Sequence, residues 1–382
     1  MKDQTDRTDP TARTDGTDRT DRVDLLYSET ESDLRAAVRA LVADRAAPAE
    51  LPGRVEDGGG VPALWKALAA DMGTAGLLVP EGFGGQGASH REAAVVLEEL
   101  GRAVTPVPYL TSAVVATETL LAAADGDATT GAAHLLGDLA AGRKVAVLAV
   151  PLSAGPDHVP AGSGTVTGVA DAVHADVLLV VRPDGLYAVD AADAQVTPQT
   201  PLDLTRPLAT VSTETGGTRL ADAAGARGAV CRGLLAGAGL LASEQLGVAE
   251  WCLEETVRYT RERHQFNRPV GSFQALKHRM AQLWLEVVGA RAAARNAADA
   301  LATASPEAPL AVAVAQAYCS RVAVHAAEEC VQLHGGIGMT WEHPAHLYLK
   351  RAKADQIALG SAGRHKEELA RLVDLPGPPV ST

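Results

Sequence analysis

Aromatic residues, long apolar runs and clusters of basic residues are all scarce in this sequence. Only 3% of its 382 residues are aromatic, whereas 47% are hydrophobic. The hydrophobic cores must therefore be built from Ala, Leu and Val, and long helices that pack closely through alanine fit this composition. A chain of this length can form two or three domains with sizeable cores.

The absence of these features also limits where we expect the protein in the cell and which partners we expect it to bind. The sequence contains no uninterrupted apolar stretch of about 18 residues and no apolar signal core at its N-terminus, so we expect neither a membrane span nor export. The formal net charge of −13 and the lack of Lys/Arg runs argue against a nucleic-acid partner. Together these features predict a cytoplasmic protein.

The four cysteines carry no recognisable pairing pattern. Cys231, Cys252, Cys319 and Cys330 fall in expected helices and form no CxxC pair. We expect buried thiols in a reducing compartment, and neither disulfides nor metal ligands.

Four zones of different composition follow one another along the chain. Residues 1–23 repeat Thr-Asp-Arg units with almost no apolar side chains, which predicts a disordered tail. Residues 24–144 have helical periodicity, residues 145–228 contain short β-rich runs, and residues 229–382 return to long helical patterns. The expected fold is α+β and multidomain, with an N-terminal helical domain, a small middle β domain and a C-terminal helical bundle.

Several helix boundaries can be placed within this scheme. A Ser/Thr–Glu capping pattern opens the helix after residue 28, and another helix is expected to begin at Ser89. Ser272 is predicted to cap the second C-terminal helix, and the third is nearly uniform in Ala and Val, which suits a buried helix or an oligomer interface. The four C-terminal helices are expected at about 230–262, 272–302, 308–334 and 345–371.

The stretch YTRERHQFNRPVGSFQALKHRM, residues 259–280, connects two of these helices. A proline and a glycine interrupt the helical pattern in its middle. Arg263 and Gln265 offer cationic and amide donors that suit a pyrophosphate, and Phe266 offers an aromatic face for a planar ring.

This stretch resembles the R-x-x-F-G-x-P-[IV]-x-x-F-Q signature of the flavin-dependent acyl-CoA dehydrogenase family. A second motif of that family is matched by QLHGGIG at residues 332–338, followed by Glu-His-Pro at 342–344 and a helix that contains Arg351. The two motifs occur in the family's order, and the similarity extends over about residues 25–372. The run GIGMTWEH looks like the branch of steroid-degrading actinobacterial members, which work as mixed assemblies.

The resemblance implies a fold, a reaction and partners. The fold would comprise an N-terminal helical domain, a small middle β-barrel and a C-terminal four-helix bundle. The reaction would be FAD-dependent α,β-dehydrogenation of an acyl thioester, either an acyl-CoA or a carrier-bound acyl group. A base would remove the α-proton while the β-hydrogen leaves as hydride to the flavin. An electron-transfer acceptor and a homo- or hetero-oligomer, a dimer or a tetramer, are implied as partners.

The matched motif positions also imply which residues contact FAD. In the family these contacts come partly from a neighbouring subunit. Asn267 stands where the family usually has Gly, and Asn tolerates a positive φ better than most residues. The implied FAD contacts are Arg263, Gln265, Phe266, Gln274, Gln332, Gly335, Gly336 and Ser361.

The position of the catalytic base departs from the family pattern. Most members carry a Glu in a Glu-Gly-Thr run, where this chain has Leu359 followed by Gly and Ser, and leucine cannot accept a proton. A minority carry the Glu at the position of Gly237. The nearest acid there is Glu244, about two helical turns further along and on a similar face. Glu244 is therefore the candidate base, the alternative being a surface or salt-bridged acid.

The β domain departs from the pattern as well. In the family, the first strand continues as Thr-Glu-Pro and this domain presents backbone and hydroxyl groups to the flavin ring. This chain has LAVPLS at residues 148–153 instead. The substitution weakens the case for flavin contacts from this domain.

Three functions remain open on the sequence. The chain is an active dehydrogenase with a displaced base, a subunit whose paralogous partner brings the carboxylate, or a flavin monooxygenase on the same fold. The substrate is equally open. Five of the eight residues at 232–239 are Gly or Ala, which either lets this helix pack closely on another or leaves room for a bulky acyl group.

Overall fold

A computed structural model describes residues 24–46, 53, 61–124, 131–156, 164–214, 216–375 and 377. The tail predicted at residues 1–23 lies outside this range. The order of helical, β-rich and helical zones expected from the sequence is confirmed.

Helices make up the N-terminal zone. The main ones are α1 (Glu29–Arg45) and α4 (His90–Arg102). The capping box expected at the start of α1, Ser28 with Glu31, is present, and α4 begins with a second one, Ser89 with Glu92. The other elements here are α3 (Val61–Lys66), η2 (Ala67–Asp71), η3 (Thr74–Gly76), η4 (Glu81–Phe83), η5 (Tyr109–Ala116), α5 (Thr117–Ala124) and α6 (Gly131–Ala140).

Two small sheets form the middle zone. The first has the strand order β1 (Ala146–Leu148), β3 (Val177–Arg182), β4 (Gly185–Asp190) and β7 (Thr218–Asp222). In it, β1 and β3 are parallel and the remaining pairs are antiparallel. The second, antiparallel sheet has the order β2 (Thr165–Ala170), β6 (Leu208–Ser212) and β5 (Gln195–Gln199). The short helices η6 (Ala172–His174) and η7 (Ala191–Asp193) connect strands.

The C-terminal zone is built on the helix α7 (Ala223–Glu262), which is 40 residues long. It begins at residue 223 and not near 230, because the Asp222 side chain caps it by accepting a hydrogen bond from the Gly225 amide. The helix expected over 345–371 is in fact two helices. The remaining elements are β8 (His264–Gln265), β9 (Arg268–Pro269), η8 (Val270–Ser272), α8 (Gln274–Ala302), α9 (Ala308–His334), η9 (Gly335–Met339), α10 (Ala345–Asp355) and α11 (Ala362–Leu372).

The predicted cap of α8 is wrong. Ser272 does not cap this helix; its hydroxyl donates to the Pro269 carbonyl oxygen at 2.6 Å and so stabilises the turn η8. Phe273 occupies the N-cap position and makes no side-chain capping bond.

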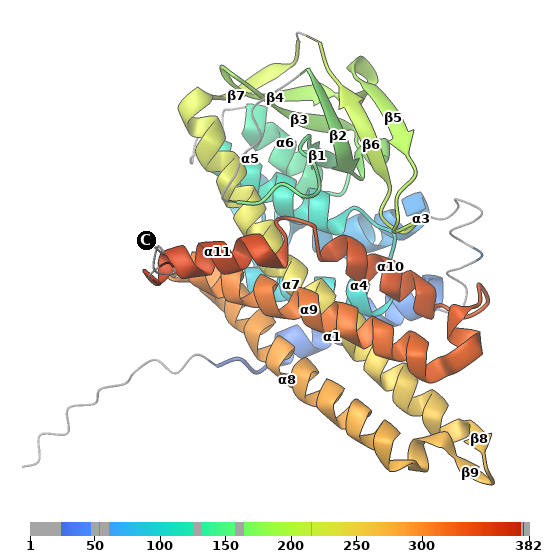
Figure 1. Cartoon of the computed structure of the whole chain (residues 1–382). Coiled ribbons are helices and arrows are strands. Elements are labelled where there is room, and N and C mark those ends of the chain that lie inside the picture. Colours follow the sequence, from blue (N-terminus) through green and yellow to red (C-terminus); the bar gives the residue numbers. More distant parts are fainter. Residues whose placement is uncertain are drawn as a thin grey trace, which may run out of the picture.

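The long helix α7 connects the two ends of the molecule. Figure 1 shows it running from the sheets to the hairpin β8–β9 at the opposite end. It packs against α4, α8 and α9, while the turn between α10 and α11 lies beneath β1 (Figure 1). By length and composition the segment Ala308–Met339, mainly α9, could cross a membrane, which the sequence reading did not anticipate. Because 67% of its apolar window is buried, it has the character of a core helix.

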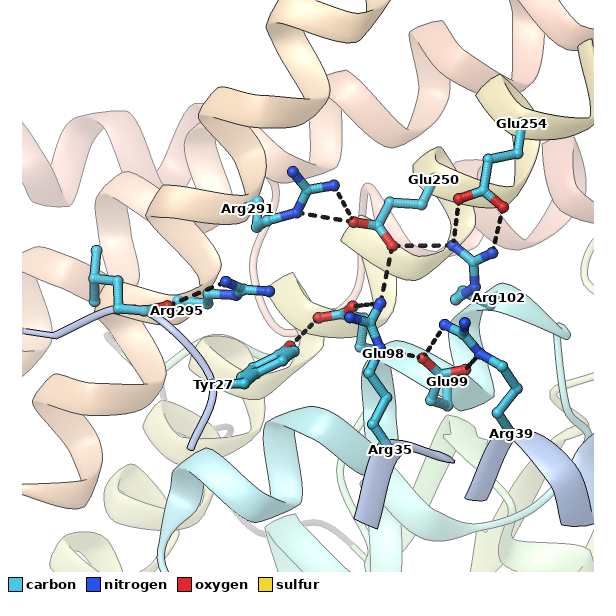
Figure 2. Close-up of polar contacts among 11 residues, drawn as sticks. Tyr27, Arg35, Arg39, Glu98, Glu99, Arg102, Glu250, Glu254, Arg291 and Arg295 are labelled. Atoms are coloured by element: carbon cyan, nitrogen blue, oxygen red, sulfur yellow. Dashed lines mark hydrogen bonds and ion pairs between the residues drawn. The ribbon is translucent and has the colours of Figure 1, made fainter. Parts of the chain in front are cut away.

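An ion-pair network holds α7 against the neighbouring helices (Figure 2). Glu98 of α4 accepts a hydrogen bond from Arg35 of α1 at 2.6 Å. Glu250 of α7 accepts from Arg102 at 3.0 Å and from Arg291 of α8 at 2.6 Å. Burial raises the pKa of Glu98, and the nearby charge of Glu250 adds to that effect. The network thus joins α1, α4, α7 and α8 through buried charge.

Candidate functional site

The two positions that could carry the base lie next to each other in space. A Cβ atom added at Gly237 of α7 would lie 3.0 Å from Leu359 Cδ1 and 2.5 Å from Val115 Cγ2. Leu359 belongs to the turn that joins α10 to α11, so two distant segments converge on one point. Neither position carries an acid in this chain.

A small apolar cavity marks this point. Its volume is about 30 Å³, whereas ligand pockets usually measure about 300–1,000 Å³. None of its lining residues is acidic, and the one polar side chain, Thr111, donates its hydroxyl to Asp171 at 2.7 Å. The lining residues are Leu110, Thr111, Val115, Val147, Leu148, Val150, Pro151, Leu152, Ala170, Leu234 and Leu359.

Hydrogen bonds tie together the segments that line this small cavity. The Leu359 amide donates to the Leu152 carbonyl oxygen at 2.7 Å, and this bond ties the α10–α11 turn to the segment after β1. The His365 Nε2 lies 3.0 Å from the Leu359 carbonyl oxygen. Both Leu359 and Gly360 have positive φ, 52° and 100°, and a Cβ at Gly360 would come within 2.9 Å of His365 Nε2. The side chain, the amide and the carbonyl oxygen of Leu359 therefore all make contacts within this chain.

The glycines of α7 serve close packing. A Cβ added at Gly233 would lie 2.0 Å from Thr119 Oγ1, and one at Gly239 would lie 2.5 Å from Leu301 Cδ1. Neighbouring side chains therefore fill the space that these glycines leave. Of the two readings of this stretch, the structure favours helix–helix packing over room for an acyl group.

Glu244, the candidate base, lies in a buried ion cluster and does not line the cavity. Its Oε1 accepts from Arg206 Nη2 at 2.6 Å and also from Arg351 Nη1. Burial opposes ionisation of Glu244, but the charges of these two arginines outweigh it and lower its pKa. A carboxylate held by two guanidinium groups is a poor proton acceptor, so these contacts favour the salt-bridged alternative over Glu244 as the base.

The same cluster connects the β domain to the helical bundle. Arg351 of α10 donates to Asp203 in the segment before β6, and Arg206 of that segment donates to Asp355. Burial and the neighbouring Glu244 raise the pKa of Asp355 to about 7, and its Oδ2 has no hydrogen-bond partner. No sequence pattern pointed to this cluster, because its members come from three separate segments.

The first segment expected to bind FAD is the exposed hairpin β8–β9. Arg263, Gln265 and Phe266 are exposed, Phe266 by 86%. Phe266 and Asn267 have φ of 53° and 60°, so Asn267 does adopt the left-handed conformation expected from the sequence. The Phe266 ring packs edge-on against Phe273 at 6.1 Å. Cationic, amide and aromatic groups are thus presented together to a ligand.

The second segment lies at the end of α9. Gln332, Gly335 and Gly336 are exposed, and a Cβ at either glycine would meet nothing within 4 Å. Gly335 leaves the helix with a φ of 63°. Since Tyr259, one turn before Arg263, stacks on His334 at 4.3 Å, the two segments meet at the same end of α7.

The two remaining predicted FAD contacts lie apart from each other. Gln274 is exposed at the start of α8, close to the hairpin in sequence. Ser361 instead caps α11, beside the closed turn, where its Oγ accepts from the Arg364 amide at 3.4 Å. The exposed segments fit the polar adenosine diphosphate part of FAD, whereas the cavity beside Leu359 is too small for a flavin ring. FAD binding by these individual residues stays a prediction.

The cysteines agree with the sequence reading. Cys252, Cys319 and Cys330 are buried free thiols, and Cys231 is half-buried. Burial raises the pKa of Cys319 to about 12.

Comparison with known protein families gives matches at both ends of the chain. The family described as acyl-CoA dehydrogenase, C-terminal domain, matches residues 225–373. The corresponding N-terminal domain matches residues 28–131.

Individual relatives cover nearly the whole chain. It is 37% identical over 351 residues to acyl-CoA dehydrogenase IpdE2 of Mycolicibacterium smegmatis, which covers 90% of this chain and 98% of the relative. The identity to IpdE2 of Mycobacterium tuberculosis is 38% over 345 residues, covering 90% and 96%.

Two solved structures share the fold. The ChsE4-ChsE5 complex from Mycobacterium tuberculosis superposes with a TM-score of 0.81 at 26% identity and covers 93% of this chain and 100% of that one. The Tcur3481-Tcur3483 steroid ACAD G363A variant gives a TM-score of 0.78 at 27% identity, covering 91% and 98%.

Proposed function

The chain belongs to the acyl-CoA dehydrogenase family, and on that premise we propose that it is a base-lacking subunit of a mixed assembly. It takes part in the FAD-dependent dehydrogenation of an acyl-CoA, and a related partner chain supplies the carboxylate. The observation that carries the proposal is the small apolar cavity, without an acidic lining residue, at the point where Leu359 and Gly237 meet.

Abstraction of the α-proton needs a basic side chain within hydrogen-bond reach. Leu359 has none, and the cavity beside it has no acidic lining residue. The Leu359 amide could polarise a bound carbonyl group, but it already donates to Leu152. This chain therefore supplies neither the base nor a free donor from that turn.

The role that we assign to the two exposed segments, the hairpin β8–β9 and the end of α9, is cofactor binding. FAD, when bound, accepts the hydride of the dehydrogenation. Arg263 and Gln265 offer hydrogen-bond donors to the diphosphate, and the open backbone at Gly335 and Gly336 lets a ligand approach closely. The chain holds and orients the cofactor, while the partner carries the reacting centre.

The similar structures support an assembly of this kind. The ChsE4-ChsE5 structure is a complex of two named proteins, and Tcur3481-Tcur3483 likewise names two. The latter is described as a steroid ACAD, which supports a ring-bearing acyl-CoA as the substrate class. Neighbouring side chains fill the space beside the glycines of α7, so this helix leaves no room for a bulky acyl group. The partner would therefore set the preference for acyl size.

The decisive experiment is purification of the chain alone and together with a co-encoded paralogue. We expect FAD absorbance and acyl-CoA dehydrogenation in the complex, and no turnover by this chain alone. Arg263→Ala in this chain should reduce the FAD content of the complex, although the partner is unchanged. Turnover by the isolated chain loaded with FAD would disprove the proposal.

A further inference from the structure

A second group of titratable residues surrounds His334, away from the closed cavity. His334 is the last residue of α9, directly before Gly335, and its side chain is completely buried. Its ring stacks on Tyr259 of α7 at 4.3 Å and lies 4.4 Å from the ring of His343. Because Tyr259 precedes Arg263 by one helical turn, this ring connects the two exposed segments.

The contacts of His334 show where its protons lie. Nδ1 is 2.7 Å from the Cys330 carbonyl oxygen, so it must carry a hydrogen. Nε2 is buried, has no hydrogen-bond partner, and faces Glu255 Oε1 at 3.8 Å. A lone pair directed at the half-buried Glu255 carboxylate is repelled, whereas a second proton turns the contact into an attraction. The geometry therefore favours the imidazolium form.

The other groups around Glu255 agree with this assignment. The Ala345 amide donates to His343 Nδ1 at 3.2 Å, so the proton of a neutral His343 is on Nε2, 3.6 Å from Glu255 Oε1. Arg258 Nε donates to the other carboxylate oxygen at 2.8 Å. Burial opposes the negative charge of Glu255, but the contacts with His334, His343 and Arg258 outweigh it and hold its pKa far below the usual range.

The cluster of Glu255, His334 and His343 suits a protonated His334 ring better than a metal ion. The ligand atoms of Glu255, His334 and His343 do lie within 4.8 Å of one another. A metal needs the lone pair of each imidazole nitrogen that it binds. The Ala345 amide claims the lone pair of His343 Nδ1, which leaves Nε2 protonated. Arg258 already balances the charge of Glu255.

The Cys330 thiol also contacts His334, and Cys252 and the Tyr348 phenol interact with that thiol in turn. Cys330 Sγ lies 3.6 Å from His334 Nδ1, and a hydrogen bond from Cys252 of α7 lowers the pKa of Cys330. Burial raises the pKa of Tyr348 of α10, which keeps that phenol neutral. Burial also opposes a charge on His334, but the contacts with Cys330 and Glu255 outweigh it and raise its pKa to about 9.

We propose that the charged ring of His334 is a positioning residue that holds the Gln332–Gly336 turn against α7, in the arrangement that binds the diphosphate end of FAD. This inference rests on the proposed function of the two exposed segments. A cation at the C-terminal end of α9 is also favoured by the helix dipole. When the ring loses its proton, the attraction to Glu255 is lost and the turn loses its anchor on α7.

The test compares FAD affinity in wild type, His334→Phe and His346→Phe at several pH values, in the complex where only the complex binds FAD. Phenylalanine keeps the stacking on Tyr259 but carries no charge. His346, which stacks on Trp341 at 4.3 Å, is the matched control. We expect His334→Phe to bind FAD at least about tenfold more weakly at neutral pH, equivalent to about 1.4 kcal/mol. His346→Phe should behave as wild type.

The pH dependence provides a second readout. Because the folded-state pKa of His334 is raised from 6.5 to about 9, its contribution is complete below about 6.5 and is lost as the pH rises through about 9. Wild-type affinity should therefore fall across that range toward the value of His334→Phe, whose own profile should be flat. Glu255→Gln, which keeps the ring, should move the midpoint of the fall to lower pH.

Each alternative has its own outcome. Equal FAD affinity of His334→Phe and wild type over the whole range would overturn the positioning role and leave the proposed function standing. If wild type binds stoichiometric Zn²⁺ and His334→Phe does not, the site holds a metal ion and the proposed role of the charged ring is wrong. If wild type binds no FAD, alone or with its partner, the proposed function fails and this inference fails with it.

Discussion

Leu359→Glu tests the closed cavity most directly. Leu359 is only 4% exposed and shares an apolar lining with Val115 and Leu234. Loss of the buried leucine costs about 1.5–3 kcal/mol, and a buried carboxyl group without a hydrogen-bond partner costs roughly another 1–3 kcal/mol. We expect the free energy of unfolding to fall by about 3–5 kcal/mol at neutral pH.

The size of this loss should depend on pH, because a buried, unpaired carboxyl group resists ionisation. Its folded-state pKa would be raised above the unfolded value of about 4.3. The linked stability is then present below that value and is lost as the pH rises through the folded-state pKa. Leu359→Glu should therefore be less stable at about pH 8 than at about pH 5.5 relative to wild type.

Urea unfolding of three variants separates the causes. Leu359→Gln introduces a polar group of similar shape without a charge, so its deficit should not change with pH. Leu359→Met keeps an apolar side chain of similar volume and should cost less than about 1.5 kcal/mol. The reasoning would be refuted if Leu359→Glu unfolded at the wild-type urea concentration at both pH values and desaturated an acyl-CoA with bound FAD. The α10–α11 turn would then open, and the chain would have a reacting centre of its own.

Three further predictions concern charged and polar side chains. Arg263→Ala removes a charge-assisted donor worth about 1.5–3 kcal/mol and should weaken FAD binding about 10–150-fold in equilibrium dialysis, while Arg261→Ala on the same helix end should not. Asp355→Asn should flatten the pH dependence of urea unfolding. Because the folded-state pKa of Asp355 is raised to about 7, this group stabilises the wild type below about pH 4. That contribution is lost as the pH rises through about 7. Tyr27→Phe removes the hydroxyl that donates to buried Glu98 and should lower the free energy of unfolding by about 1–3 kcal/mol; an unchanged urea midpoint would show that this bond contributes nothing.

Features set by neighbouring residues were predictable from the sequence. The capping boxes at Ser28 and Ser89 and the positive φ of Asn267 follow from the chemistry of a few adjacent side chains. The break between α10 and α11 was not predicted, because it depends on distant partners. Leu152 and His365 hold the Leu359 backbone out of the helix, and neither is marked by a local pattern.

Some features of the candidate site could likewise be predicted from the sequence and others could not. The missing base could be predicted, because Leu359 and Gly237 stand at motif positions and neither can accept a proton. The environment of Glu244 could not be predicted, because it is set by Arg206, 38 residues away, and by Arg351 of another helix. The small size of the cavity could not be predicted either, since it results from the packing of several segments.

The length of α7 bears on the kind of partner that we propose for the chain. Gly237, beside the small apolar cavity, lies in α7, and Arg263, beside the exposed hairpin, caps the C-terminal end of that helix, 263 − 237 = 26 residues further along. At about 1.5 Å per residue they are separated by about 39 Å, a distance that one FAD molecule cannot bridge. A flavin ring whose diphosphate binds at the hairpin must therefore lie against a different subunit. A second copy of this chain would offer the same small apolar cavity, which supports the proposal that the reacting centre belongs to a chain of different sequence.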